Sequence, residues 1–378
     1  MSQVFPAHWD VLPFSLAVKD ATSEYSKLQK SEYLEQGRFP IVDQGQQKFG
    51  GYTDDESVVS LDGCPAIVFG DHTRIFKFID EPFCLGADGA KVLEPKAELD
   101  KKFLFYYLSS LNIESAGYSR HFKFLKENVV PVPPLPEQKR IAAILDKADA
   151  IRRKRQQAIQ LADDFLRAVF LDMFGDPVTN PKGWEVRLSG ELFSVPPRIG
   201  TTTPADGQGC LVVRVGEIGK QDINFSKCGR AQLKDSELER FILRSGDTVL
   251  ARAIGSKRQL GKASFFSGYS ESVYIDSHVM RLRPNVKICN PEWFYRFISS
   301  DGGKSLLQKA GGETAVQFNI NAKQAASLLI PLPPIELQNE FIAFCQKYSK
   351  NKAHLSRQAG DFEVLFSSLS QKAFSGQL

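Results

Sequence analysis

The chain has 378 residues, which is enough for two ordinary domains and long for a single mixed globule. Its 42% hydrophobic and 24% charged residues exclude a wholly disordered chain, and its net charge of +4 permits nucleic-acid binding without requiring it. No apolar run is long enough to span a bilayer, and residues 1–20 lack a signal-peptide pattern. We therefore expect a cytoplasmic protein without membrane contact.

The six cysteines are scattered along the chain and form no Cys-x-x-Cys pair. No histidine stands near them at the spacing of a zinc site. We expect idle, reduced thiols and no metal ligands.

Residues 1–130 are expected to form a first mixed α/β globule. Within it, Gly37–Tyr52 is typical of a strand followed by a glycine-rich loop, whose amides are suited to pairing with base edges. A second, basic loop follows Gly117. The candidate DNA contacts in these loops are Gln44, Gln46, Gln47, Lys48, Tyr52, Arg120, His121 and Lys123. Ordinary solvated loops explain the same residues equally well, so both interpretations stay open.

Residues 131–180 are expected to hold a proline-rich segment and a long helix. The first proline-rich segment, Val130–Gln138 (VPVPPLPEQ), runs without a gap into Lys139–Phe174, which contains no glycine or proline. Prolines are excluded from helix interiors but are accepted just before or in the first turn, so this segment predicts a helix start. Positions 141, 144, 148, 151, 155, 158, 162, 165 and 169 follow the three-four alternation of a coiled-coil seam.

Residues 181–328 are expected to form a second mixed α/β globule. A loop after the strand-like Thr248–Leu250 carries four cations between residues 252 and 262, which favours phosphate or guanine contact over a merely solvated loop. Gln317, Asn319 and Asn321 alternate along a strand-like run and would share one face, although ordinary strand-edge polarity explains them as well. The candidate DNA contacts here are Arg252, Ser256, Lys257, Arg258, Gln259, Lys262, Gln317 and Asn319.

Residues 329–378 are expected to repeat the proline-rich segment and the long helix. The second proline-rich segment, Ile330–Gln338 (IPLPPIELQ), echoes the first one 200 positions later and leads into Asn339–Phe374, in which Gly360 is the one glycine. The matched seams predict an intramolecular coiled coil of the two helices. A helix of roughly 37 residues is about 55 Å long and would span about 16 base pairs of duplex.

Two weaker echoes extend the repeat into the globules. Pro6–Val11 matches Pro181–Val186, and the helix-like Phe103–Ser110 resembles Trp293–Ser300. The chain is therefore predicted to be a pseudo-twofold tandem of globule, helix, globule and helix.

Motifs for catalysis are missing from the sequence. It contains neither the Asn-Pro-Pro-aromatic loop nor the glycine-rich cofactor loop of an adenine methyltransferase, and its glycine-lysine segments fail the phosphate-loop spacing. No histidine stands in a recognisable nucleophile motif. We expect no catalytic residues in this chain.

The proline-rich, Glu-Gln-containing segments with their helices, together with the closing Phe374-Ser375-Gly376, resemble the specificity subunit of Type I restriction-modification systems. The second segment departs from the pattern, with Glu336-Leu337-Gln338 in place of Pro-Glu-Gln. The resemblance covers essentially the whole chain. It implies two target-recognition domains at opposite ends of an antiparallel helix pair, which read a bipartite site in double-stranded DNA.

The resemblance also implies protein partners. Two methyltransferase subunits would dock on the helices, and restriction subunits would join them. The partners, and not this chain, would use S-adenosylmethionine, and ATP with Mg for restriction. The candidate partner contacts are Glu137, Gln138, Arg152, Arg153 and Lys154. The alternative is a coiled-coil adaptor that binds proteins without DNA specificity, which a salt-insensitive interaction would favour.

Overall fold

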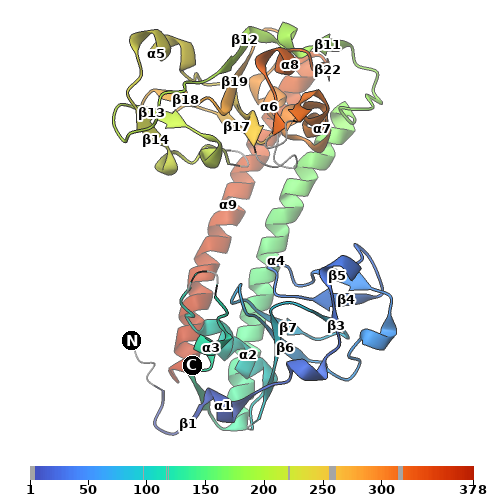
Figure 1. Ribbon diagram of the computed structural model, residues 1–378, viewed down its shortest axis with the longest axis vertical. Helices are drawn as coiled ribbons and strands as arrows, with labels where there is room; N and C mark the ends of the chain where they lie inside the picture. The colour runs from blue at the N-terminus through green and yellow to red at the C-terminus, as the bar shows by residue number, and fades with distance from the viewer. Residues whose placement is uncertain are drawn as a thin grey trace. The chain divides into compact units, whose positions relative to one another are not determined.

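The computed structural model describes residues 5–96, 98–115, 117, 119–219, 222–254, 261–313 and 318–378. Within it the chain divides into two compact units, which are drawn in Figure 1. Unit 1 comprises Met1–Ala158 with Leu355–Leu378, and unit 2 comprises Ile159–His354. The two long helices, α4 (Leu135–Phe174) and α9 (Ile335–Phe374), each contribute to both units. The units therefore do not follow the predicted domain boundaries, which set the helices apart from the globules.

Unit 1 is built from two four-stranded sheets and a two-stranded ribbon. The first sheet has the order β2 (Val18–Asp20), β9 (Ala90–Pro95), β6 (Ala66–Gly70) and β7 (Phe76–Ile79). The second has the order β3 (Lys27–Leu28), β8 (Cys84–Gly86), β4 (Phe39–Val42) and β5 (Gly51–Thr53). The ribbon pairs β1 (Asp10–Pro13) with β10 (Val129–Val132), and the short helices are α1 (Phe14–Ala17), α2 (Lys101–Ser110) and α3 (Phe122–Leu125).

Unit 2 has a similar set of sheets. A four-stranded sheet has the order β12 (Phe193–Ile199), β19 (Val279–Pro284), β15 (Asp247–Ala251) and β17 (Ala263–Phe266). A three-stranded sheet has the order β14 (Gly229–Ala231), β13 (Cys210–Val213) and β18 (Val273–Ile275). Smaller strand sets are β11 (Val186–Leu188) with β22 (Leu329–Pro331), and β16 (Ala253–Ile254), β21 (Phe318–Asn319) and β20 (Gly312–Glu313). The helices are α5 (Asp235–Phe241), α6 (Pro291–Ser299), α7 (Asp301–Ala310) and α8 (Ala322–Ala326).

The two units share one strand order. The order β2-β9-β6-β7 in unit 1 corresponds to β12-β19-β15-β17 in unit 2, and β5-β4-β8 corresponds to β14-β13-β18. The sheet pairings match as well, since β4 runs parallel to β8 and β13 runs parallel to β18. The predicted mixed α/β class is confirmed, and the duplication extends to strands that share no evident sequence echo.

The weak sequence echo at the start of each globule pairs with the proline-rich segment. In unit 1, Val11 of β1 lies opposite Pro131 of β10, and in unit 2, Val186 of β11 lies opposite Pro331 of β22. The proline-rich segment is therefore an edge strand as well as a helix start. Proline is tolerated there because its missing N–H costs no ladder hydrogen bond on an edge.

A buried glutamine in each proline-rich segment ties the long helix to its globule. The Gln138 amide donates to the carbonyls of Glu98 (2.8 Å) and Pro133 (2.7 Å) and accepts from the Asp100 N–H at 2.7 Å. Asp100 is the N-cap of α2, the first helix-like echo. Because the Gln138 side chain is fully buried, its predicted role as a partner contact is wrong, and it holds the junction together instead.

Gln338 repeats this arrangement in unit 2. Its amide donates to the Pro333 carbonyl at 2.8 Å and accepts from the Asn290 N–H at 2.8 Å. Asn290 caps α6, the second helix-like echo, and Gln338 is also fully buried. The three separate echoes of the sequence thus meet at one equivalent junction in each unit.

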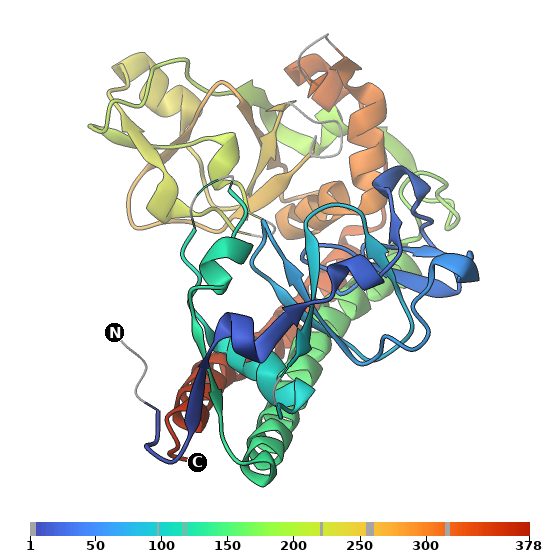
Figure 2. The same ribbon diagram turned by 60° about the horizontal axis from the view of Figure 1, so that its bottom comes forward.

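The two long helices pack antiparallel within each unit, as Figures 1 and 2 both show. In unit 1, Arg155 of α4 meets Gln358 of α9 at 3.4 Å, and Arg152 lies over the Phe366 ring at 5.0 Å. In unit 2, the Phe165 ring lies 6.1 Å from that of Phe344. Residue numbers on the two helices run in opposite directions along these contacts.

The ends of the helices reach into the globule cores. Phe174, at the end of α4, packs edge-on against Trp293 of unit 2, with ring centroids 5.8 Å apart. Phe374, at the end of α9, packs edge-on against Phe103 of unit 1 at 5.7 Å. The predicted seam differs from this arrangement, because Leu166 and Phe170 are buried near the end of α4 while Phe165 remains 46% exposed. Near its end, α4 therefore buries one face against the globule of unit 2 and no longer follows a strict coiled-coil seam.

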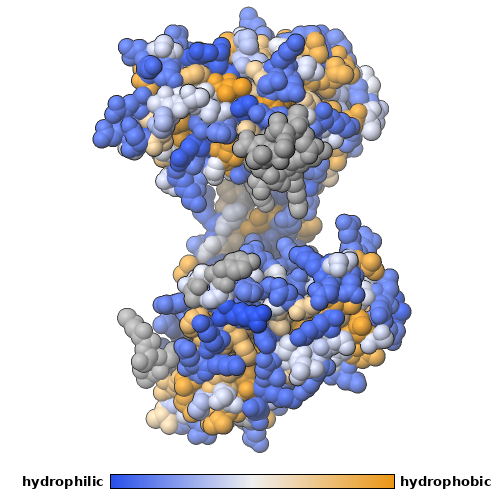
Figure 3. All heavy atoms as spheres, viewed as in Figure 1, coloured by the Kyte–Doolittle hydropathy of each residue, from blue (hydrophilic) through white to orange (hydrophobic). Residues whose placement is uncertain are grey.

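The surfaces of the units are mostly polar. Hydrophilic side chains cover much of the visible face of each unit, with smaller apolar areas among them (Figure 3). Within the described ranges, no helix combines the length and apolar character needed to cross a bilayer. All six cysteines are free, and burial raises the pKa of the Cys84 thiol to about 11, which keeps it protonated at neutral pH.

Candidate nucleic-acid interface

In unit 1, several strands end at the same edge, where their loops meet. Register pairs place the ends of β4 and β8 together, and the end of β6 beside the start of β9. Hydrogen bonds join the loops, since Asp71 N–H donates to the Gly89 carbonyl at 2.7 Å and the Thr73 hydroxyl donates to the Gln44 carbonyl at 2.6 Å. We call residues 43–47, 71–74, 87–89 and 120–123 the strand-end surface of unit 1.

The glutamine loop contributes both exposed and structural residues to this surface. Gln46 and Gln47 are exposed, as a base-reading role requires. Gln44 is half-buried, and its side-chain oxygen accepts from the His72 N–H at 3.2 Å. Lys48 is exposed but forms ion pairs with Asp80 (3.3 Å) and Glu81 (3.0 Å), which already neutralise its charge.

Tyr52 belongs to β5 and not to the loop. Its ring is half-buried and lies 6.3 Å from that of Phe49, and its N–H donates to the Leu34 carbonyl at 2.9 Å. Its DNA contact stays a prediction.

The basic loop of unit 1 is anchored by His121. This residue is 1% exposed, and both its N–H and its Nδ1 lie 2.9 Å from the Asp71 carbonyl oxygen. His121 is therefore positioned for holding the loop against β6, and the predicted direct DNA contact is wrong for this side chain. Arg120 and Lys123 on either side are exposed and keep their predicted role.

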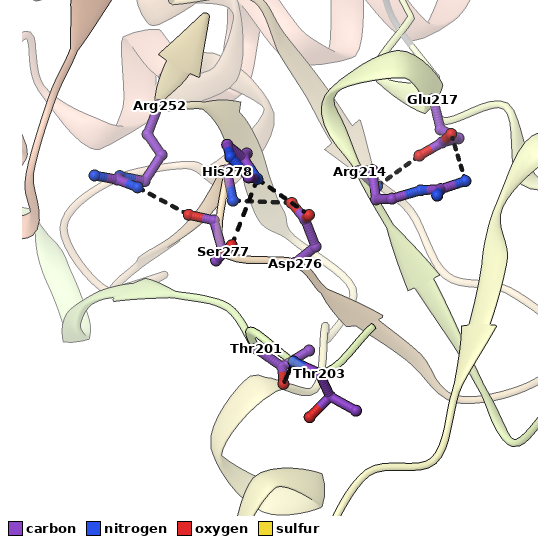
Figure 4. Close-up of polar contacts among 8 residues, drawn as sticks. All are labelled: Thr201, Thr203, Arg214, Glu217, Arg252, Asp276, Ser277 and His278. Carbon is purple, nitrogen blue, oxygen red and sulfur yellow. Dashed lines mark hydrogen bonds and ion pairs between the residues drawn. The ribbon is translucent and has the colours of Figure 1, made fainter. Parts of the chain in front are cut away.

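The corresponding surface of unit 2 gathers the ends of β12, β13, β15 and β18 and the start of β19. Asp276 N–H donates to the Val213 carbonyl at 3.0 Å, and Thr201 N–H donates to the Ile275 carbonyl at 2.9 Å. Figure 4 shows the residues that these bonds bring together from different loops. We call residues 201–203, 214, 252 and 276–278 the strand-end surface of unit 2.

Arg252 links the loops of this surface by hydrogen bonds. Its guanidinium donates to the carbonyls of Ile320 (3.1 Å) and Ser277 (2.8 Å) and to the side chain of Asn319 (2.6 Å). Burial lowers the pKa of Arg252, although the nearby Asp276 carboxylate opposes that shift. Both Arg252 and Asn319 are half-buried and take part in linking loops, and their direct DNA contacts stay predictions.

The exposed members of the unit 2 surface were missed by sequence reasoning. Arg214 and His278 have side chains that are 47% and 53% exposed, and both are anchored by a neighbouring carboxylate. Arg214 pairs with Glu217 at 3.6 Å, and His278 Nδ1 lies 3.3 Å from Asp276. A usable signal is the polar Asp-Ser-His turn between the apolar residues 273–275 and 279–280, which indicates a tight strand-to-strand turn.

Threonines complete the exposed edge beside this turn. The Thr201 hydroxyl donates to Glu237 of α5 at 2.6 Å and accepts from the Thr203 N–H at 3.0 Å. Thr201 is buried, whereas Thr202 is exposed. Hydroxyl, guanidinium and imidazole groups therefore share one edge, a set of donors suited to phosphate oxygens and base edges.

Some predicted contacts lie outside the described residues. These are Ser256, Lys257, Arg258, Gln259 and Gln317. Lys262, which follows them, is half-buried. Asn321, predicted to share a strand face with Asn319, instead caps α8 by accepting from the Gln324 N–H at 2.9 Å, because asparagine is a strong N-cap residue.

The predicted partner contacts on α4 differ in exposure. Lys154 is exposed, and Arg153 is 67% exposed while pairing with Asp149 at 3.0 Å. Arg152 also pairs with Asp149, at 2.7 Å. Glu137 is half-buried and accepts from the Trp9 indole at 3.2 Å. Of the predicted set, Arg153 and Lys154 are thus the most accessible.

The sequence is similar to known specificity subunits. A family profile described as the Type I restriction modification DNA specificity domain matches residues 21–161. The chain is 23% identical over 338 residues to the Type I restriction enzyme EcoBI specificity subunit of Escherichia coli, an alignment that covers 79% of this chain and 70% of that protein. It is 25% identical over 272 residues to the EcoKI specificity subunit of the same species, covering 66% of this chain and 57% of that protein.

The fold is also similar to solved structures. The S subunit of a Type I restriction-modification system from M. genitalium matches with a TM-score of 0.52 and 16% identity, over 97% of this chain and 96% of that one. A chain described with the structural basis of complex assembly and conformational transition of the type I R-M system matches with a TM-score of 0.53 and 16% identity, over 99% of both chains. At these identities the likeness shows a shared fold.

Proposed function

We propose that the chain is a specificity subunit of a Type I restriction-modification system and that it reads a bipartite DNA site, one half-site through each unit. The observation that supports this most directly is the duplicated strand order, which presents a strand-end surface with exposed polar loops in both units. A single reader would need one such surface. Two surfaces of one design match a target with two parts.

The strand-end surfaces supply the proposed contacts. In unit 1 these are Gln46, Gln47, Arg120 and Lys123, and in unit 2 they are Arg214, Thr202 and His278. Glutamine amides pair well with adenine edges, and guanidinium groups pair with guanine or phosphate. His121 holds its loop from inside, so it acts on DNA through the residues that it positions.

The two long helices are proposed to set the gap between the half-sites. Each is 40 residues long, which corresponds to about 60 Å at 1.5 Å per residue, or roughly 18 base pairs of duplex. Their ends are fixed in the globules by Phe174 and Phe374 and by the buried glutamines. A spacer fixed at both ends gives a fixed gap.

Chemistry is proposed to come from partner subunits. Two methyltransferase subunits would dock on the exposed faces of the helices, around Arg153 and Lys154, and restriction subunits would join them. S-adenosylmethionine, and ATP with Mg, would then be bound by those partners and not by this chain. The sequence supports this division because it lacks methyltransferase and phosphate-loop motifs.

Selection from a pool of random duplexes tests the proposal. The full-length chain, assembled with its methyltransferase partner, should enrich duplexes that carry two short conserved blocks with a constant gap. Its affinity should fall steeply with salt, because phosphate contacts release counterions. Enrichment of no sequence, together with a salt-insensitive interaction, would favour the protein-binding adaptor instead.

A further inference from the structure

A buried arginine stands in the four-stranded sheet of unit 2 without a carboxylate of its own. Arg281, in β19, is 5% exposed, and its Nη1 donates to the carbonyls of Ile242 (3.0 Å) and Arg240 (3.3 Å). Its Nε is buried with no hydrogen-bond partner in the described part of the chain. An unpaired buried cation is costly, so some further interaction is expected to explain its presence.

More arginines surround it. Arg198 of β12 lies opposite Arg281 in the strand register, which places the two side chains on one face of the sheet. Arg283 lies two residues along β19 on the same face, and Arg244 precedes β15. We call Arg198, Arg244, Arg281 and Arg283 the arginine cluster.

One carboxylate serves this cluster. Asp247 is fully buried and binds the Arg283 guanidinium at 2.6 and 2.7 Å, so its charge is already matched. Elsewhere among the described residues, no carboxylate lies within ion-pair distance of Arg198, Arg244 or Arg281. Burial lowers the pKa of Arg281 to about 10, and the charges of Arg283, Arg198 and Arg244 add to that shift, while the Asp247 carboxylate opposes it. The cluster therefore has an excess of positive charge.

Unit 1 shows that the fold does not require these residues. The register pairs Val68 with Val92 in unit 1 and Val249 with Arg281 in unit 2, so Val92 stands where unit 2 has Arg281. Val92 is fully buried in the apolar core between the two sheets of its unit. Ala66 likewise occupies the place of Asp247. The same sheet is thus stable with an apolar pair, and unit 2 has replaced it with charges.

The Arg198 side of the cluster adjoins the strand-end surface of unit 2, whereas Arg244 and Arg283 lie toward the opposite ends of β15 and β19. Arg198 precedes Thr201 by three residues at the end of β12, and Thr201 binds Glu237 of α5. Arg244 follows α5 and donates its N–H to Asp247 at 2.7 Å. Arg244 is exposed and Arg198 is half-buried, so an anion can reach the cluster from the surface.

We propose that the arginine cluster binds a backbone phosphate of the DNA that unit 2 reads. Guanidinium groups match phosphate oxygens in charge and in their two-pronged geometry, and a phosphate supplies the negative charge that the cluster lacks. This inference rests on the proposed function and adds to it an asymmetry between the units. Unit 2 gains a phosphate anchor that unit 1 does not have.

Salt dependence of duplex binding tests the anchor. In the assembled full chain, the double variant R198Q/R244Q is expected to reduce the slope of log affinity against log salt by about 0.9, the contribution of one neutralised phosphate. The selected motif should stay the same, because phosphate contacts carry no sequence information. The matched control is R187Q, at a half-buried arginine of unit 2 that already pairs with Glu185 at 3.0 Å, and it should leave the slope unchanged.

The outcomes separate the two claims. If the wild type selects a two-part motif but R198Q/R244Q keeps the wild-type slope, the phosphate anchor is wrong and the proposed function stands. If the wild type selects no motif, the proposed function itself fails. Inorganic phosphate, exchanged for chloride at constant ionic strength, is the second probe. If inorganic phosphate binds at the cluster but does not weaken duplex binding, the cluster is a site for a free anion, and the DNA assignment is wrong.

Discussion

At the scale of single residues, Gln138 has a structural role that differs from its predicted role as a partner contact. The Glu-Gln pair of the first proline-rich segment stands at a helix start, where exposed residues are common, so a partner contact is a natural prediction for Gln138. The structure buries the amide and satisfies it with three backbone groups. The recurrence of glutamine at position 338 is the signal for this role, because a repeated junction needs the same bond in both copies.

Removing this amide should destabilise unit 1. Gln138→Ala would leave the Asp100 N–H and two carbonyls unsatisfied in the interior, at a cost of about 2–4 kcal/mol. Thermal or urea unfolding measures the change. Gln156→Ala, at an exposed position of the same helix, is the control and should cost less than about 0.5 kcal/mol. Equal effects of the two substitutions would refute the junction role.

Asp146 gives a prediction for pH. Burial by itself would raise the pKa of this carboxyl, but hydrogen bonds from Lys102 (2.8 Å) and Tyr106 (3.1 Å) lower it in sum below its ordinary value of 3.8. A carboxyl with a lowered pKa in the folded state stabilises the fold above that ordinary value and loses this contribution as pH falls through the lowered pKa.

Asp146→Asn should therefore reduce stability at pH 7 and matter less below pH 3.8. Both partners of the ion pair are about 40% exposed, so solvent screening limits the effect to less than about 1 kcal/mol. Urea midpoints of the two proteins across this pH range measure it. A difference that grows toward acid pH would have the wrong sign.

At the scale of elements, the long helices could be predicted more closely than the sheets. The near absence of glycine and proline after the proline-rich segments located α4 and α9 to within a few residues. The seam was less predictable, because a periodic pattern does not show where a helix stops facing its partner helix and starts facing a globule. Leu166 and Phe170 are buried for that second reason.

Gly360 offers a test of the helix itself. It lies in the interior of α9, is exposed, and has no atom within 4 Å of the position that a Cβ would take. Gly360→Ala should stabilise the chain by about 0.5–1 kcal/mol, because alanine loses less backbone entropy in a helix. Calorimetric melting measures the gain. Destabilisation by this substitution would mean that α9 is bent or contacted at residue 360.

At the scale of the whole molecule, the sequence predicts a duplication and the structure extends it. The echoes around Trp9 and Trp184 and in the proline-rich segments are short, and they mark the junctions where packing constrains residue types most. The strands between them have diverged, and only their order and pairing show that they correspond. Loop residues were the hardest to predict, since His121 has the chemistry of a DNA contact but is buried, and Arg252 is half-buried and bonded to neighbouring loops.

The similar junctions and the different loops of the two units fit a protein that keeps one scaffold while the DNA sequence that it reads changes. The junctions hold the helices and globules together, so they vary little between the two halves. The proposed contacts of the strand-end loops differ between the units, with Gln46, Gln47, Arg120 and Lys123 in unit 1 and Thr202, Arg214 and His278 in unit 2. Two different half-sites are the expected consequence.

Modified-base sequencing of the source organism's genome, with this gene intact and deleted, tests the central claim most directly. We predict that deletion removes methylation from a single two-part motif whose halves differ in sequence and whose gap is constant, and that restoring the gene brings the methylation back. If the gene is expressed and its deletion leaves every methylated motif unchanged, the chain does not determine the methylated sequence. The protein-binding adaptor would then be the better explanation.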